Sequence, residues 1–194
     1  MSAFTNVSVD GYFAGPHGEI DWFKGSDDEE KAFTREAAKP SATLIFGHTT
    51  YDMMAGYWPT PDAVRNDPIV AGVMNRAQKI VFSKTMKPVK DGPSWKNVTV
   101  LHEINKEEIA RLKEQPGGDM VILGSGLIVQ QLSNLGLIDE YQLMVHPVIL
   151  GAGKYLFHSV NPMNLKLLNT RIFRSGKVFL TYHLAESEQK RGSS

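Results

Sequence analysis

Hydrophobic and polar positions follow two different rhythms along this chain of 194 residues. Short apolar runs that stop at a glycine or a polar loop predict buried strands, and apolar positions spaced three and four apart behind capping residues predict helices. The predicted strands cover residues 3–9, 42–46, 79–83, 97–101 and 120–123. The predicted helices cover residues 27–38, 49–55, 67–76, 105–115 and 127–135. This alternation through two-thirds of the chain predicts a largely parallel sheet covered by helices.

Capping residues mark the starts of three of these helices. Ser26 opens a capping box that ends at Glu29, and Asn105 opens a second box. Asp67 is followed by a proline, which is typical of an N-cap and the first helical position. Residues 58–61, which include two prolines, are predicted to form a loop.

The pattern changes in the last third of the chain, where strands dominate. Residues 139–145 alternate between apolar and polar, which is the period of a strand. Residues 165–173 and 177–183 predict two further strands joined by a hairpin turn, so the sheet should gain an antiparallel edge. Residues 1–185 are predicted to form one domain, and the polar residues 186–194 a flexible tail.

Composition narrows the classes of function. Hydrophobic residues make up 42% and charged residues 22%, as in ordinary soluble domains. Lysine plus arginine and aspartate plus glutamate both number 21, and a net charge of zero argues against nucleic acid as a partner. The chain has no cysteine, and its six histidines lack metal-ligand spacing, so no metal site is expected. Without a signal-peptide pattern or a membrane-length apolar stretch, we expect a cytoplasmic protein with no membrane partner.

The most distinctive local feature is the turn Gly124-Ser125-Gly126, which joins an apolar run to the helix predicted from Leu127. The first N–H groups of a helix lack intrahelical acceptors, and the helix dipole adds positive potential there. Glycine lets a ligand approach the backbone closely. The turn therefore predicts a phosphorylated ligand such as a nucleotide. A plain strand-to-helix turn is the alternative interpretation.

Other predicted strands end in residues that suit the same ligand. The carboxyl ends of parallel strands meet at the edge where α/β proteins bind ligands. The candidates are Gly47, His48, Thr49, Thr50, Ser83 and Lys84. For each residue taken singly, the alternative is a helix cap at Thr49 or Thr50 and a solvated charge at Lys84. The joint pattern of a second glycine turn and a Ser-Lys pair predicts a dinucleotide site.

Seven motifs in a fixed order resemble the dihydrofolate reductase superfamily, in particular stand-alone proteins similar to the C-terminal reductase domain of bacterial riboflavin biosynthesis enzymes. The motifs are residues 8–12, 47–51, 79–83, 124–126, 136–141, 147–157 and 176–182. The resemblance covers nearly the whole chain. It implies a three-layer α/β fold, with a central mixed, mostly parallel sheet, helices on both faces and a C-terminal antiparallel hairpin.

The resemblance also implies an NADPH-dependent reductase. Its substrate would be a pterin or an aminopyrimidine, such as dihydrofolate or 5-amino-6-(5-phosphoribosylamino)uracil. In such proteins both glycine turns hold the dinucleotide phosphates, and Ser83 and Lys84 would lie near the adenosine 2′-phosphate. The family usually has arginine where this chain has His48. Because an imidazole is mostly neutral and lacks the guanidinium fork, NADH stays open as an alternative cofactor.

Hydride transfer also needs support for proton delivery. The candidate acids are Asp10, after the first strand, and Asp21, before the first helix. The resemblance favours Asp21 as the proton-relay partner, with Asp10 lining the pocket or fixing a loop. The alternatives are a capping role for Asp21 and an ordinary turn at Asp10.

Aromatic residues are predicted to wall a slot for a heterocyclic substrate. They are Trp22, Phe23, Tyr51, Trp58 and Phe157. The alternative for each is a place in the hydrophobic core. We expect a small-molecule substrate and a homodimer. The competing functions are a nucleotide-binding protein of the same fold without turnover and a reductase of another small carbonyl or imine.

Overall fold

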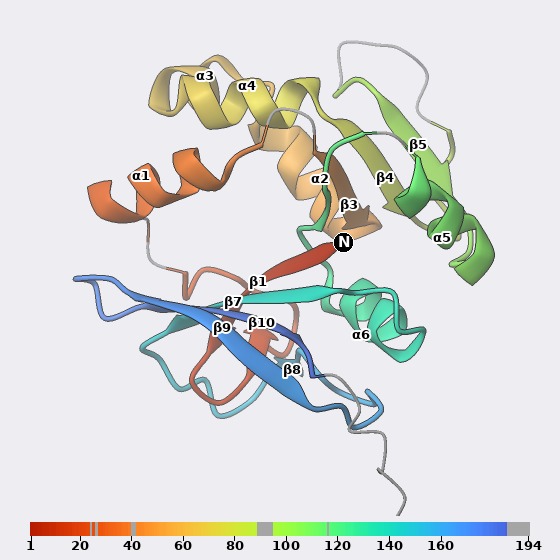
Figure 1. Cartoon of the computed structure of the whole chain (residues 1–194). Helices are drawn as coiled ribbons and strands as arrows, with labels where there is room; N and C mark the ends of the chain where they lie inside the picture. The colour runs from red at the N-terminus through yellow and green to blue at the C-terminus, as the bar shows by residue number, and fades with distance from the viewer. Residues whose placement is uncertain (24, 26, 40–41, 89–94, 116, 186–194) are drawn as a thin grey trace, which may run out of the picture.

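A twisted eight-stranded sheet runs through the centre of the computed structural model (Figure 1). The structure describes residues 1–23, 25, 27–39, 42–88, 95–115 and 117–185, so the predicted tail lies outside the described residues. The strands are β1 (Ser2–Ser8), β2 (Tyr12–Ala14), β3 (Thr43–Gly47), β4 (Gln78–Phe82), β5 (Val98–Leu101), β6 (Met120–Ile122), β7 (Glu140–His146), β8 (Lys154–Tyr155), β9 (Leu165–Ile172) and β10 (Val178–Leu184). The helices are α1 (Asp28–Ala37), α2 (His48–Tyr57), α3 (Pro61–Asn66), α4 (Pro68–Arg76), α5 (Lys106–Glu114) and α6 (Gly126–Asn134).

The strand order is β5-β4-β3-β6-β1-β7-β10-β9. All pairs from β5 through β7 are parallel, and β10 is antiparallel to both β7 and β9. The predicted mixed sheet with a C-terminal antiparallel edge is therefore confirmed. The chain also forms a small separate sheet from β2 and β8, in which the Tyr12 and Tyr155 rings stack at 4.1 Å. These two strands were not predicted, because each is too short to show a period.

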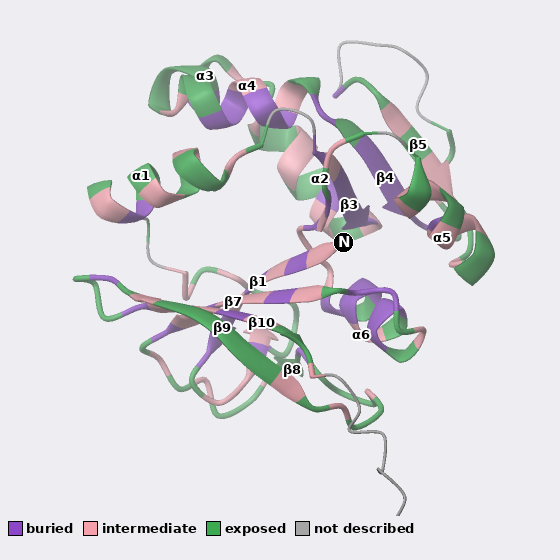
Figure 2. Ribbon diagram, in the orientation of Figure 1, coloured by how far each residue is buried: buried purple, intermediate pink, exposed green. Residues whose placement is uncertain are grey.

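Helices cover both faces of the sheet, as predicted. On one face, α2 and α4 pack over Phe46 and Val81, both fully buried. On the opposite face, α5 and α6 pack over a core that includes Ile122 and Leu132. α1 covers the strands near the C-terminal hairpin, where Phe33 contacts Phe173 and Phe179. Figure 2 shows the result, with buried β3 and β4 inside and a largely exposed β9 at one edge.

Side-chain caps set the helix starts. The carboxylate of Asp27 accepts the N–H of Glu30, so α1 is capped one residue later than the predicted box. Ser26, the predicted cap, lies outside the described residues. Asn105 and Asp67 cap α5 and α4 as predicted.

The loop predicted for residues 58–61 is confirmed at residues 58–60, but the helix α3, which begins at Pro61, was not predicted. The hydroxyl of Thr60 accepts the N–H of Ala63, and Pro61 takes the first helical position. This is the same cap and proline pair that marks the next helix, so the signal was present in the sequence. Among the helices that the structure describes, none is both long and apolar enough to cross a bilayer.

Candidate active site

A cleft opens in the sheet beside β1. That strand pairs with β7 from Ser2 to Ser8, but its pairing with β6 covers Ser2 and Ala3 alone. The sheet therefore separates beyond Ala3, and a cleft of about 310 Å³ occupies the gap. Its walls come from β1, from the loop around β2, from the start of α2 and from the turn before α6. The carboxyl ends of β3 and β6 thus point at the cleft, where α/β folds bind ligands.

Two helices begin at this cleft with free N-termini. Within the described residues, neither α2 nor α6 has a side-chain hydrogen bond at its N-cap. The other four helices are capped by Asp27, Thr60, Asp67 and Asn105. Thr49 and Thr50 of α2 and Gly126 and Leu127 of α6 line the cleft. Uncapped N–H groups at two converging helix dipoles are suited to a polyphosphate.

The two glycine turns lie in direct contact. The N–H of Gly47 donates to the carbonyl oxygen of Gly124 at 3.0 Å. A Cβ on Gly47 would lie 2.7 Å from Ser125 Oγ, and one on Gly124 would lie 3.2 Å from Thr50 Oγ1. Gly124 also has φ +118°, which side chains rarely adopt. Gly124 therefore has a backbone conformation that suits glycine, and a side chain at position 47 would displace the Ser125 hydroxyl.

The predicted 2′-phosphate residues gather at the end of β4, outside the cleft lining. His48 Nδ1 lies 3.3 Å from Ser83 Oγ, and His48 Nε2 lies 3.3 Å from a carboxylate oxygen of Asp52. His102 Nδ1 lies 2.8 Å from the Ser83 carbonyl oxygen. Lys84 is exposed beside them. The structure thus brings His48, Ser83 and Lys84 together and adds His102, which lacks a sequence signal of its own.

The two candidate acids do not line the cleft. Asp10 accepts the N–H groups of Leu150 and Gly151 at 3.1 and 2.8 Å. A hydrogen bond from Ser8 lowers the pKa of Asp10, and these two N–H groups lower it further. Asp10 thus holds the loop that contains Leu150 and Gly151, and it is not among the residues that line the cleft. Asp21 is exposed in the turn that follows β2, next to a cleft-lining residue rather than among the lining residues.

Two predicted slot aromatics belong to the core instead. Tyr51 is 4% exposed and packs against Phe46 and Trp95, because it lies on the face of α2 that contacts the sheet. Trp58 packs against the same core, with its indole N–H donated to Met54 Sδ. The structure therefore places these two residues in the core and outside the lining of the cleft.

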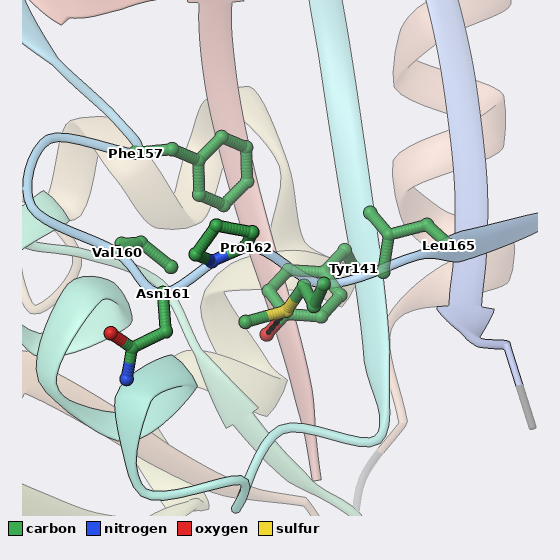
Figure 3. A pocket seen from close by; sticks show the side chains of 7 residues that line it. Tyr141, Phe157, Val160, Asn161, Pro162 and Leu165 are labelled. Atoms are coloured by element: carbon green, nitrogen blue, oxygen red, sulfur yellow. Dashed lines mark hydrogen bonds between the residues drawn. The ribbon is translucent and has the colours of Figure 1, made fainter. Parts of the chain in front are cut away.

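Phe157 lines a different and smaller cavity of about 220 Å³ (Figure 3). Its ring meets Tyr141 edge to face at 5.9 Å, and Pro162 and Leu165 complete the walls. The Tyr141 hydroxyl donates to Ser133 Oγ, so the polar atom of this aromatic pair is already satisfied. Phe157 thus lines a cavity that is separate from the cleft at the glycine turns.

Apolar side chains that the sequence did not single out form much of the cleft wall. Phe4, Phe13 and Met53 line it, together with the predicted Phe23. Trp22 is not among the lining residues; its ring packs edge to face against Phe23 at 4.1 Å. Trp22 therefore supports the wall without forming it. In a sequence, an apolar residue that lines a cleft looks the same as one that belongs to the core, so no pattern predicted the place of these residues.

The cleft contains little charge. Within the part of the chain that the structure describes, Lys154 is the charged residue in its lining, and no carboxylate lines it. A Cβ at Gly18 would lie 3.3 Å from Lys154 Nζ, so the ammonium group lies against the loop that follows β2. The cleft thus combines apolar walls, two free helix N-termini and one cation, which suits an anionic ligand that carries an aromatic ring.

The fold and the position of this cleft are typical of α/β proteins that bind ligands where their parallel strands end. Residues 2–180 match the profile of the RibD C-terminal domain, and the chain belongs to this family. It is 34% identical over 178 residues to YyaP of Bacillus subtilis (strain 168), a protein described as uncharacterized. That match covers 91% of this chain and 90% of YyaP.

Solved structures share the whole fold. A protein from Shewanella sp. PV-4 with a provisional riboflavin-biosynthesis name superposes with a TM-score of 0.69 at 23% identity, covering 95% of this chain and 98% of the other. Dihydrofolate reductase from Enterococcus faecalis, solved with NADP(H), gives a TM-score of 0.63 at 18% identity, covering 95% and 96%. The predicted dihydrofolate reductase-like fold is therefore confirmed.

Proposed function

We propose that the protein is an NADPH-dependent reductase that transfers a hydride to a small heterocyclic acceptor, a pterin or an aminopyrimidine, in the cleft beside β1. The observation that carries the proposal is the pair of uncapped helix N-termini, α2 and α6, which meet at one cleft through contacting glycine turns. Family membership supports a reductase. The Enterococcus faecalis neighbour, whose structure contains NADP(H), supports a nicotinamide cofactor.

The described residues fit such a cofactor. The N–H groups that start α2 and α6 would hold the pyrophosphate, with Thr49, Thr50 and Ser125 adding hydroxyls. Ser83 and Lys84 would face the adenosine end, where an ammonium group favours the 2′-phosphate of NADPH over NADH. When bound, the nicotinamide supplies the hydride. The apolar wall residues around it would exclude water and hold the acceptor ring in contact.

Proton delivery is the second part of the reaction. No carboxylate of the described residues lines the cleft, so a proton has to arrive through water. Asp21 directly follows Ile20, which lines the cleft, and its side chain is exposed. We propose that Asp21 relays the proton through solvent at the cleft mouth.

The test is NADPH oxidation, followed by the loss of its absorbance, with dihydrofolate and with the aminopyrimidine 5-amino-6-(5-phosphoribosylamino)uracil as acceptors. The proposal expects oxidation with at least one acceptor, and slower oxidation of NADH. Tight NADPH binding without oxidation of either acceptor would favour the alternative, a nucleotide-binding protein of this fold. We also propose a cytoplasmic homodimer. Exposed Leu167, Leu168 and Ile172 on the edge strand β9 support the dimer, which light scattering would test.

A further inference from the structure

One face of the C-terminal part of the sheet is uncharged and almost entirely apolar. Residues that pair directly across antiparallel strands have their side chains on the same face of the sheet. Val178, for example, pairs with Val145 on one side and with Ile172 on the other. The residues of this face, termed the apolar face, are Tyr141, Leu143 and Val145 of β7, Val178, Leu180, Tyr182 and Leu184 of β10, and Leu165, Leu167, Thr170 and Ile172 of β9.

A β-bulge in β9 keeps charge away from the apolar face. The register between β9 and β10 shifts by one residue at Leu168, so that Leu167 pairs with Tyr182. Without this extra residue, Lys166 would lie on the apolar face. With it, the titratable residues of β7 and β9 and the histidine of β10 all lie on the opposite face, namely Glu140, His146, Lys166, Arg171 and His183.

The two faces of these strands are covered to different extents. On the opposite face, Phe33 of α1 packs against Phe179, and the Arg171 guanidinium group lies 5.1 Å from the centre of the Phe33 ring. On the apolar face, Ile172 is 72% exposed and Leu167 is 49% exposed, and β9 is exposed along most of its length (Figure 2). Antiparallel sheets usually turn apolar side chains to a core and polar ones to water. An apolar face in water is costly unless another surface covers it.

A cavity adjoins the apolar face at one end. Tyr141 and Leu165 of that face line it together with Phe157, whose exposed ring meets Tyr141 at 5.9 Å (Figure 3). The described residues of its lining carry no charge, and its volume is about 220 Å³. The cavity offers space for an apolar side chain of a partner, and side chains that enter such pockets dominate the energy of many interfaces.

A second copy of this chain is the partner that the apolar face fits. Because the face carries no charge, two copies related by a two-fold axis pack together without like-charge repulsion. The chain's own C-terminal residues are a poor match, since residues 186–194 contain no apolar side chain.

The size of the apolar face also suits a dimer. Three strands that lie about 4.8 Å apart and are about 25 Å long cover roughly 350 Å² in projection. The relief of the side chains and the adjoining Phe157 ring enlarge this surface, and a standard interface buries about 800 Å² of accessible surface per partner. Exposed apolar patches of several hundred Å² mark interaction sites.

We propose that two copies of this chain pack their apolar faces together, sheet on sheet, to form the homodimer. The inference gives an interface to the homodimer of the proposed function, and it rests on that part of the proposal and not on hydride transfer. It differs from a dimer in which two β9 edges pair through their backbones, because edge pairing leaves both faces of the sheet open.

Two neighbouring residues of β9 distinguish these arrangements. Thr170 lies on the apolar face and Asn169 on the opposite face, and both are exposed. Thr170→Arg introduces a charge from each copy into the interface and should raise the dissociation constant of the dimer about a hundredfold or more, measured by sedimentation equilibrium. Asn169→Arg, the matched control, should leave the dimer intact. Ile172→Arg should act as Thr170→Arg does, and Ile69→Arg, at an exposed position of α4, should not.

Cysteine labelling tests the same interface without an added charge. The chain has no cysteine, so a single introduced thiol is the only one that reacts. In the dimer, the thiol of Thr170→Cys should react with iodoacetamide about tenfold or more slowly than that of Asn169→Cys, because the core of an interface excludes water. Equal rates in the two variants would show that the apolar face is open and would overturn the proposal.

The homodimer, its interface and the proposed activity fail in different experiments. A parent chain that sediments as a monomer would overturn both the homodimer and the interface. A dimer that survives Thr170→Arg and Ile172→Arg, or one that Asn169→Arg dissociates as strongly, would overturn the interface and leave the homodimer. The substituted residues do not line the cleft, so NADPH affinity measured by calorimetry should be the same in every variant. A parent that does not bind NADPH would overturn the proposed reductase and leave the interface.

Discussion

The N–H of Gly47 donates to the carbonyl oxygen of Gly124 at 3.0 Å, which joins the turn after β3 to the turn after β6. Because each turn starts a helix without a side-chain cap, this hydrogen bond fixes two sets of free N–H groups relative to each other. The site for the phosphates of the proposed cofactor is thus built from backbone groups and held by backbone contact.

Replacing Gly47 by alanine should crowd the contact between the two turns. The new Cβ would lie 2.7 Å from Ser125 Oγ, so the Ser125 hydroxyl has to leave its place at the cleft. Loss of hydrogen bonds to a charged phosphate should raise the dissociation constant of NADPH about tenfold, measured by calorimetry. The control is Gly56→Ala in the same helix α2, where a Cβ meets nothing within 4 Å. It should keep full affinity and stabilise the fold by up to about 1 kcal/mol. Unchanged affinity in Gly47→Ala would argue against a phosphate site at these turns.

Lys84 should determine the preference of the protein for NADPH over NADH. Its ammonium group is exposed next to Ser83, so Lys84→Ala should raise the dissociation constant of NADPH about fivefold and leave that of NADH unchanged. Added salt should reduce the difference between parent and variant, because exposed charges are screened. Lys87→Ala removes an exposed charge of the same sign nearby and serves as the control. Equal losses for NADPH and NADH would place the 2′-phosphate elsewhere.

Asp21→Asn tests the proposed proton relay. The side chain is exposed, so the variant should fold and bind NADPH as the parent does. Steady-state turnover should fall about tenfold or more, within the range for a lost general acid or base. Turnover equal to that of the parent would remove Asp21 from the reaction.

The buried Lys79 should give the fold a distinctive dependence on pH. Its ammonium group is 1% exposed, donates to the carbonyl oxygens of Asn75, Ala77 and Lys96, and lies 4.6 Å from the centre of the Trp95 ring. Burial nevertheless lowers its pKa from 10.5 to about 8. Between these two values the unfolded chain binds more protons than the folded chain, so the free energy of unfolding rises with pH there.

The size of the effect follows from that pKa difference. The parent should gain about 3 kcal/mol relative to Lys79→Met as the pH rises through this window, and gain nothing below it. Denaturant unfolding of both proteins across the window measures it. A parent-to-variant difference that does not change with pH would show that Lys79 keeps its ordinary pKa.

Much of the architecture was predictable because its signals are local. Asn105 and Asp67 cap helices where the sequence places them, and period-two alternation marks β7. The same local logic at Thr60 and Pro61 was available for α3. The order of the strands was not predicted, since pairing across the sheet leaves no local pattern in one sequence.

The sequence predicted the part of the candidate site that is formed by the backbone of the two glycine turns. Gly124 stands out because its φ of +118° suits glycine, and Gly47 because a Cβ there would crowd the Ser125 hydroxyl. The side chains that line the cleft were harder to predict, because an aromatic residue is as common in a core as in the wall of a cleft. Tyr51 and Phe13 look alike in sequence, and only the direction in which each element faces separates the core residue from the wall residue.

The most direct test of the central claim is the amide spectrum of ¹⁵N-labelled protein titrated with NADPH. If the free helix N-termini bind the cofactor, the largest chemical-shift changes should be those of the Thr49, Thr50, Gly126 and Leu127 amides. The amides at the capped starts of α4 and α5 should not shift. Shifts confined to other surfaces, or no shift at saturating NADPH, would contradict the account.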